Sequence, residues 1–232
     1  KLMKMVGHDK LYVATKLSPY IPTIDQIYKD IDSLAQIEKH SNIIDLIDQV
    51  NVNDSIYWPM QINKSFYFIK LEKYKEVIEI VEAGLAHNDP ELNKSFYINK
   101  AAAFDQMKDH SKALITMEQA LMEYPANYEF YYNLGRYYEE LQKYDKAFDA
   151  YKISATLNPF HATIHLKIGN FYLKKRMIAQ ALMCFDTYLL LNPDGSDSFA
   201  ILKSLNNVIG QDNATKDIEG FTISENTDQF EE

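Results

Sequence analysis

Cysteine is nearly missing from this sequence, and other residue types that mark particular kinds of protein are scarce. The 232 residues include a single cysteine, Cys184, which excludes an intrachain disulfide and leaves the redox compartment open. Seven glycines and seven prolines are few for a chain of this length. Because both residues interrupt regular structure, their scarcity favours long helices over many short strands and turns.

Long apolar runs and surplus positive charge are also missing. No stretch approaches the ~18 apolar residues of a membrane span. No signal-peptide pattern opens the chain, although it begins at Lys1 without an initiator methionine, so a trimmed leader is compatible with it. The formal net charge is −9, and residues 210–232 carry −6 of it, with seven acidic residues and one lysine. An acidic chain without a basic stripe fits a phosphate backbone poorly, so we expect no nucleic-acid partner. The lack of a long apolar run predicts no membrane insertion.

What the sequence does contain is a block of 34 residues that recurs. Residues 128–161 and 162–195 align without a gap. The matched positions are Leu134 with Ile168, Gly135 with Gly169, Tyr138 with Tyr172, Ala147 with Ala181, Tyr151 with Phe185, and Pro159 with Pro193. This is the W-x2-L-G-x2-Y…A-x3-F…P arrangement, and in it the sequence resembles the tetratricopeptide repeat family. The resemblance implies an all-α fold, a right-handed α-solenoid of tandem helical hairpins.

The resemblance extends upstream and covers residues 24–195. Residues 94–127 fill the same slots with Tyr97, Ala101, Phe104, Ala113, Met117, Ala120 and Pro125. Across a two-residue insertion, residues 58–91 supply Ser65, Phe68, Tyr74, Val77, Val81 and Gly84, with Pro90 as a late closing proline. Residues 24–57 form a diverged fifth unit, with Ile31 at the glycine slot. We therefore predict five units, preceded by an irregular arm (1–23) and followed by a capping helix (196–210) and an acidic disordered tail (211–232).

Each unit is expected to be two antiparallel helices, A and then B, that cross at small residues. The eighth and twentieth slots are small, which predicts that Gly135 faces Ala147 and that Gly169 faces Ala181. Aromatic residues at the eleventh and twenty-fourth slots should fill the space beside the crossing. Tyr188 stands where the family prefers a small residue, and we expect it to pack on the capping helix.

The resemblance also implies that helix A lines a concave groove, with its second, fifth, sixth, ninth, twelfth and thirteenth residues pointing inward. This inward set includes Leu166 in the last unit. The candidate partner-binding residues are Ile62, Asn63, Phe66, Ile98, Asn99, Tyr132, Asn133, Arg136, Lys167 and Asn170. Asparagine occupies the sixth slot in three successive units, at Asn63, Asn99 and Asn133. Because an amide both accepts and donates hydrogen bonds, one asparagine per unit can hold the backbone of an extended peptide.

Selectivity would come from the other groove residues. Ile62, Phe66, Ile98 and Tyr132 would form apolar pockets, and Arg136, Lys167 and Lys174 would favour an acidic group. The competing interpretation is that asparagine is merely tolerated at exposed groove positions, since exposed polar residues are common.

Candidates for chemistry are weak. His161 and His165 have the spacing of a helical metal pair, but no third ligand accompanies them, so packing is the favoured interpretation. No glycine-rich phosphate loop or acid–base pair occurs, and we expect no enzyme activity, metal or cofactor. The leading hypothesis is a non-catalytic scaffold that binds an extended segment of a protein or peptide partner in the groove. The alternative is a structural subunit that self-associates, or docks rigidly, through its end helices or convex face.

Overall fold

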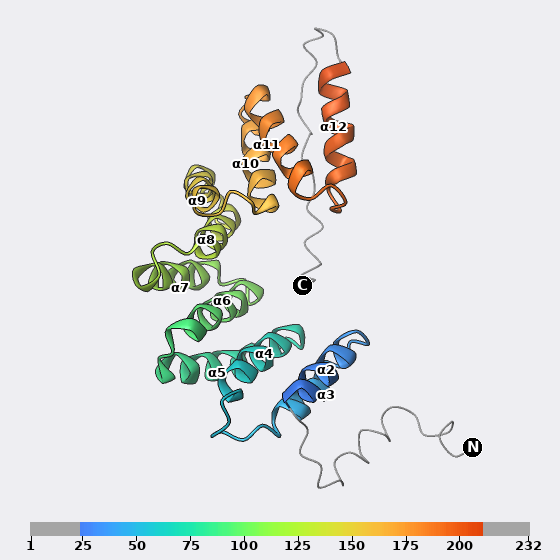
Figure 1. Ribbon diagram of the computed structural model, residues 1–232. Helices are drawn as coiled ribbons and strands as arrows, with labels where there is room; N and C mark the ends of the chain where they lie inside the picture. The colour runs from blue at the N-terminus through green and yellow to red at the C-terminus, as the bar shows by residue number, and fades with distance from the viewer. Residues whose placement is uncertain (1–23, 211–232) are drawn as a thin grey trace, which may run out of the picture. The chain divides into compact units, whose positions relative to one another are not determined.

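The computed structural model describes residues 24–210, and all regular structure in that range is α-helical (Figure 1). The predicted arm 1–23 and tail 211–232 lie outside the described residues. The helices are α2 (Ile24–Ala35), α3 (His40–Ile47), α4 (Tyr57–Lys70), α5 (Tyr74–His87), α6 (Pro90–Gln106), α7 (His110–Glu123), α8 (Tyr128–Glu140), α9 (Tyr144–Leu157), α10 (Ala162–Lys174), α11 (Ile178–Leu191) and α12 (Ser198–Gly210). The chain divides into two compact units at Leu92 and Asn93, within α6, and each is described by itself.

The turn from helix A to helix B has the same backbone conformation in every hairpin. One non-glycine residue adopts a left-handed conformation in each turn, with φ between 55° and 62°. These residues are Glu38, Glu72, Lys108, Gln142 and Arg176. They follow one another after 34, 36, 34 and 34 positions, so the backbone repeats with the same period as the sequence and the 36-residue step contains the inserted pair.

Paired hydrogen bonds explain why this conformation recurs. At Gln142, the residue's own amide donates to the Glu139 carbonyl (2.8 Å), and the next amide, from Lys143, donates to the Tyr138 carbonyl (2.8 Å). This is the Schellman arrangement, which satisfies carbonyls that the end of a helix leaves open. The corresponding pairs of bonds close α2, α4, α6 and α10. Each helix A therefore ends through the same local interaction, although the residues in the left-handed conformation are of four different types.

In the first unit, the helices α2 to α5 pack through buried aliphatic side chains. Ile43 and Ile47 of α3, Met60 of α4 and Val77 of α5 have no exposed surface. The end of this unit differs from the sequence prediction. Pro90 does not close helix α5 but is the first residue of α6, where a missing N–H costs nothing. The carboxylate of Asp89 accepts hydrogen bonds from the amides of residues 91 and 92, so α6 begins a turn earlier than the other A helices.

In the second unit, glycine allows helices A and B to cross closely. A Cβ atom at Gly135 would lie 2.5–2.9 Å from the ring of Tyr151, and one at Gly169 would lie 2.6 Å from the ring of Phe185. The nearest neighbours of the two glycines are therefore the aromatic residues of the twenty-fourth slot, whereas the sequence analysis paired them with the alanines of the twentieth slot. A side chain at the glycine slot would displace a buried ring.

Helix α12 covers the end of the second unit. Ile201 and Leu205 of α12 share one buried cluster with Leu166 of α10 and with Tyr188 of α11. Tyr188 thus packs with the capping helix. Leu166, which the sequence analysis placed on the groove face, is only 1% exposed because it belongs to this cluster. The hydroxyl of Ser198 donates to the Asn192 carbonyl (2.7 Å) and fixes the start of α12.

Candidate partner-binding face

The sequence-predicted partner-binding residues fall in both units. Ile62, Asn63 and Phe66 lie on α4 in the first unit, where all three are half-buried. The others lie on the A helices of the second unit, α6, α8 and α10. We call this second set, together with Asp105 and Glu139, the A-helix face; its residues are Ile98, Asn99, Asp105, Tyr132, Asn133, Arg136, Glu139, Lys167 and Asn170.

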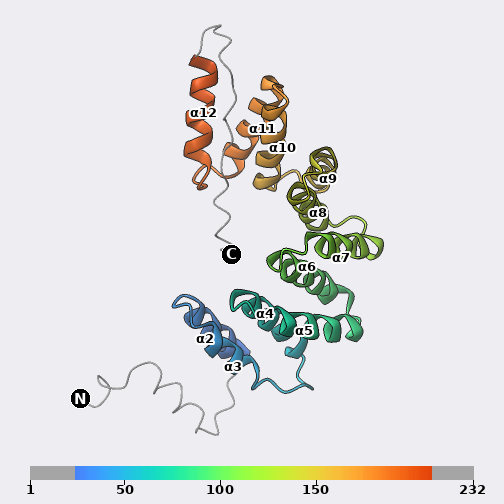
Figure 2. The same ribbon diagram turned by 180° about the vertical axis from the view of Figure 1, so that it is seen from behind.

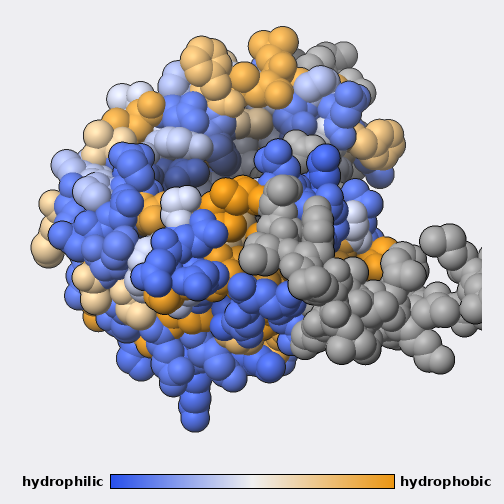
Figure 3. Space-filling model, turned by 60° about the horizontal axis from the view of Figure 1, so that its bottom comes forward, coloured by the Kyte–Doolittle hydropathy of each residue, from blue (hydrophilic) through white to orange (hydrophobic). Residues whose placement is uncertain are grey.

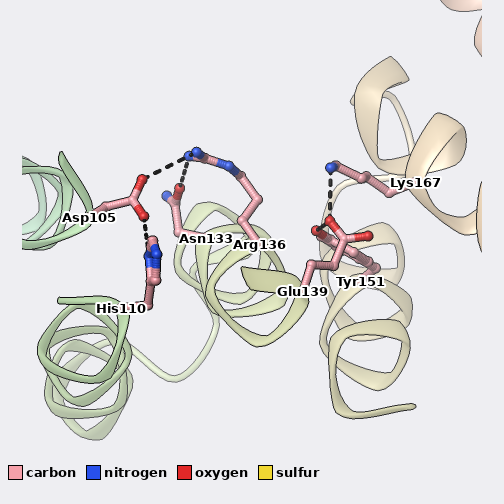
Figure 4. Close-up of polar contacts among 7 residues, drawn as sticks. All are labelled: Asp105, His110, Asn133, Arg136, Glu139, Tyr151 and Lys167. Atoms are coloured by element: carbon pink, nitrogen blue, oxygen red, sulfur yellow. Dashed lines mark hydrogen bonds and ion pairs between the residues drawn. The ribbon is translucent and has the colours of Figure 1, made fainter. Parts of the chain in front are cut away.

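Charged side chains connect α6 to α8 on the A-helix face. The Arg136 guanidinium lies 3.6 Å from the Asp105 carboxylate, and the other Asp105 oxygen lies 2.8 Å from Nδ1 of His110 (Figure 4). Arg136 also donates to the side-chain oxygen of Asn133 (3.4 Å). Burial lowers the pKa of Arg136, but the electrostatic influence of Tyr137, Tyr132 and Asp105 outweighs this effect and the net shift is upward. Arg136 therefore stays charged and is held by the protein itself.

A second group of contacts connects α8 to α10. One carboxylate oxygen of Glu139 accepts a hydrogen bond from the Tyr151 hydroxyl (2.7 Å) and another from the Lys167 ammonium group (2.8 Å), as Figure 4 shows. The Lys167 side chain is only 12% exposed. Two of the three cations that were expected to favour an acidic ligand, Arg136 and Lys167, thus already face a carboxylate of the same unit. Lys174 differs: it is exposed at the end of α10, with its ammonium group 5.5 Å from the Tyr144 ring.

The asparagines of this face are not equivalent. Asn133 donates one amide hydrogen to the Glu129 carbonyl (3.0 Å) and accepts from Arg136, which leaves one donor and one lone pair unused. Asn99 is 9% exposed and has little surface to offer. Asn170 differs: its side-chain oxygen is buried and has no hydrogen-bond partner among the described residues, as is also true of the Asn93 side-chain oxygen on α6. Because buried acceptors are nearly always paired, the oxygen of Asn170 can accept a further hydrogen bond.

Aromatic rings form the apolar part of the face. Tyr132 is half-buried, with its ring 5.9 Å from that of Tyr151 and 5.4 Å from that of His161. Burial lowers the pKa of His161. Ile98 on α6 is also half-buried. In the first unit, Phe66 lies edge-on to Tyr67 and 5.5 Å from the ammonium group of Lys70.

The two histidines with helical metal-pair spacing contact different groups. Nε2 of His165 lies 2.7 Å from the Pro159 carbonyl, while His161 packs on Tyr128 and Tyr132. Within residues 24–210, no three or more histidine, cysteine, aspartate or glutamate residues are grouped so that they could hold a metal ion. In the same range, no helix combines the length and apolar character needed to cross a membrane.

The pairing of charges is the feature that sequence reasoning missed. Asp105 and Glu139 both occupy the twelfth slot and were expected to point inward, but their partners were not identified. The sequence does contain a signal for these ion pairs, because each carboxylate belongs to the repeat before its partner. Asp105 pairs with Arg136, and Glu139 pairs with Lys167. Identifying the partners requires the offset between neighbouring helices, which the three-dimensional structure supplies.

Comparison with known proteins assigns the repeat. The tetratricopeptide repeat model matches residues 95–127 and 128–161. A solved structure of MamA is similar in fold, with 17% identity, a TM-score of 0.54, and coverage of 75% of this chain and 97% of that one. MamA from Desulfovibrio magneticus RS-1 is similar too, with 16% identity, a TM-score of 0.53, and coverage of 73% and 95%. No curated protein matches the chain in sequence. Residues 95–161 are therefore two consecutive tetratricopeptide repeats, and the predicted fold class, tandem tetratricopeptide hairpins, is confirmed.

Proposed function

We propose that this protein is an interaction scaffold that holds an extended segment of a partner protein against the A-helix face. The tetratricopeptide match supports a scaffold in general. The observation that carries the finer proposal is the buried, unpaired side-chain oxygen of Asn170. A backbone N–H of a bound segment would supply the missing donor once the Asn170 side chain turns this buried oxygen toward the segment.

The spacing of the helices suits an extended segment. Neighbouring helices pack ~8–10 Å apart, and an extended chain advances ~3.3 Å per residue. One amide per repeat would therefore meet about every third residue of the segment. Asn133 retains a free donor and a free lone pair for this purpose, and Asn170 offers its oxygen.

The ion pairs predict the character of the segment. An acidic ligand group would have to displace Asp105 from Arg136 or Glu139 from Lys167, so it would gain little net attraction. This reverses our sequence-based expectation of an acidic ligand. We propose a segment without a net negative charge, with an apolar side chain against Tyr132.

The test begins with affinity capture on the full chain and mass spectrometry, followed by titration of labelled peptides from the captured protein. Replacing Asn63, Asn99 and Asn133 together by alanine tests the asparagine ladder, and Asn170→Ala tests the unpaired oxygen. A lost hydrogen bond of about 1 kcal/mol predicts roughly fivefold weaker binding for Asn170→Ala. The matched control is Asn53→Ala, an exposed asparagine of the α3–α4 loop. Equal affinities for Asn170→Ala, the triple variant and the control would refute the groove proposal and leave the fold unaffected.

Self-association is a second candidate, favoured by exposed apolar side chains near the C-terminal end of the described chain. Leu190 and Met183 on α11 are 83% and 70% exposed, and Phe199 on α12 is 78% exposed. Met122 on α7 and Phe160 after α9 are similarly exposed, at 83% and 79%. The face drawn in Figure 3 is mainly hydrophilic, with hydrophobic groups at the top and near the centre of the view. Light scattering over a range of concentrations tests this candidate. A monomer at all concentrations would exclude it, whereas an oligomer that Leu190→Ser with Phe199→Ser dissociates would support it.

A further inference from the structure

Positive charge gathers at one edge of the second unit, although the chain as a whole is acidic. The three turns from helix A to helix B (residues 106–112, 140–146 and 174–178) contain seven lysines and arginines and three acidic residues. The three segments that follow each helix B (residues 123–129, 157–162 and 191–198) contain four acidic residues and no lysine or arginine. We call the first set of turns the basic edge; its cations are Lys108, Lys112, Lys143, Lys146, Lys174, Lys175 and Arg176.

Contacts between neighbouring turns show that the basic edge is continuous between the last two hairpins. The Lys174 ammonium group lies 5.5 Å from the Tyr144 ring, and that of Lys175 lies 3.5 Å from the Asp145 carboxylate. These cations do not form a stripe in the linear sequence, because about 34 residues separate one turn from the next. The repeat brings them together.

Much of this charge is not neutralised by the described residues. All seven cations lie on exposed residues. Within residues 24–210, no carboxylate lies within 4 Å of the charged groups of Lys108, Lys143 or Arg176. Lys146 and Lys174 lie over tyrosine rings, which leave a full positive charge at the surface. The basic edge therefore attracts anionic groups.

An anionic segment follows α12 in the sequence. Helix α11 runs antiparallel to α10, and α12 runs antiparallel to α11, so α12 ends at the same end of this unit as the α10–α11 turn (Figures 1 and 2). Leu205 of α12 shares a buried cluster with Leu173, near the end of α10. After Gly210, residues 211–232 contain seven acidic residues and one lysine, and the first carboxylate, Asp212, is two positions beyond the helix. Twenty-two residues span up to ~70 Å when extended, whereas successive helices are only ~8–10 Å apart. The segment can therefore reach every turn of the basic edge.

We propose that residues 211–232 dock within the same molecule along the basic edge, with their carboxylates on Lys143, Lys174, Lys175 and Arg176. Attachment at Gly210 keeps the local concentration of the segment in the millimolar range, so weak individual ion pairs suffice. The docked segment covers the edge against other anionic proteins, which must displace it. The basic edge shares no residue with the A-helix face as defined above, and the proposal does not depend on the proposed function.

Zero-length carbodiimide cross-linking of the full chain tests the docking, because it joins only carboxylates and amines that are in contact. We expect amide links from Asp217, Glu219 or Glu225 to Lys143, Lys174 or Lys175, identified by mass spectrometry. A mixture of ¹⁴N and ¹⁵N protein distinguishes one molecule from two. At 1 M salt, where the Debye length is ~3 Å, these links should fall several-fold.

Three outcomes would overturn the proposal. Mixed-isotope links would place the segment on a second copy. Links that are confined to other lysines, or that 1 M salt leaves unchanged, would remove the basic edge as the docking surface.

Charge variants of the full chain supply an independent measurement. A chain whose seven carboxylates in residues 211–232 are replaced by their amides has a basic edge without its occupant. A labelled peptide of sequence 211–232 should bind this chain at least tenfold more tightly than the natural chain.

Adding Lys143→Glu, Lys174→Glu and Arg176→Glu should abolish binding of the peptide. The matched control is Lys29→Glu, Lys39→Glu and Lys75→Glu, three exposed lysines of the first unit with the same change in net charge. Circular dichroism verifies that both triple variants fold. Equal peptide affinity for the natural and neutralised chains, or equal loss in both triple variants, would contradict docking on the basic edge.

Discussion

Adding one methyl group at Gly135 should destabilise the protein, although alanine is the better helix former. Its Cβ would lie 2.5, 2.7 and 2.9 Å from three atoms of the Tyr151 ring, where about 3.5–4.0 Å is normal. The ring must therefore move by about 1 Å. It is 1% exposed, packs with Ile164 and Ile168, and is held at its hydroxyl by Glu139.

The magnitude follows from two opposing effects. Overpacking a well-filled core costs about 1–3 kcal/mol. Replacing glycine by alanine inside a helix recovers about 1 kcal/mol. We therefore expect Gly135→Ala to lower the free energy of unfolding by up to about 2 kcal/mol.

The preceding repeat supplies the compensating change. Its same two slots hold Ala101 and Met117, both fully buried, so alanine is accommodated where the facing residue is a flexible methionine. In a Tyr151→Met background, Gly135→Ala should become stabilising by up to about 1 kcal/mol. The change of sign isolates the contact between the two residues.

Urea unfolding followed by circular dichroism measures all four proteins of this cycle. The fluorescence of Trp58, the only tryptophan, reports separately on the first unit. Equal destabilisation by Gly135→Ala in both backgrounds would show that the cost does not arise from the Tyr151 ring, and the packing argument would fail.

Three further predictions concern single positions. Gln142→Gly should raise the free energy of unfolding by about 0.5 kcal/mol, because glycine adopts the left-handed conformation (φ 57°) without strain, at some cost in chain entropy. The control Lys143→Gly, at a position where φ is negative, should not stabilise the protein. Equal urea midpoints for the two variants would contradict this prediction. Glu139→Ala should lower the free energy of unfolding by about 2–3 kcal/mol, because it leaves the Tyr151 hydroxyl and Lys167 without their partner. The double variant Glu139→Leu with Lys167→Met should recover much of this loss. An unaltered urea midpoint for Glu139→Ala would be inconsistent with the ion pair. Burial lowers the pKa of His161, while Glu129 opposes and His165 reinforces this shift. The folded protein therefore favours the neutral ring. The stability that the buried, neutral ring contributes is present above the unfolded pKa of ~6.5 and is lost as the pH falls through the folded pKa. His161→Asn should remove this loss, and urea midpoints of the two proteins that run parallel between pH 5 and 7.5 would refute the assignment.

The repeat could be predicted from the sequence because it depends on residue types at fixed intervals. Small residues such as Gly135 and prolines such as Pro159 stand at the same slots in successive blocks. The facing residue of Gly135 could not be predicted in the same way. Ala147 and Tyr151 are one helical turn apart, and the lean of the side chains along the helix decides which of them lies nearest.

The candidate site was only partly predictable. The sequence placed Arg136 and Asn170 on helix A, but it did not show that Asp105 neutralises Arg136 or that the oxygen of Asn170 lacks a donor. Leu166 was misplaced because only the structure shows that α12 covers it. Such properties depend on how neighbouring helices are offset, which local patterns do not encode. The assignment of the ten partner-binding residues stays a prediction, as does the division of the chain into five units.

The ion pairs between α6, α8 and α10 have a mechanical consequence for any ligand. Asp105 with Arg136, and Glu139 with Lys167, each join two A helices on the same side. A ligand that wedges between two of these helices must separate opposite charges, whereas a thin segment that lies across them leaves both pairs closed. The strength of these ion pairs thus limits how far neighbouring hairpins can separate. High salt weakens the pairs, so it should allow the A-helix face to accept a wider range of ligand shapes.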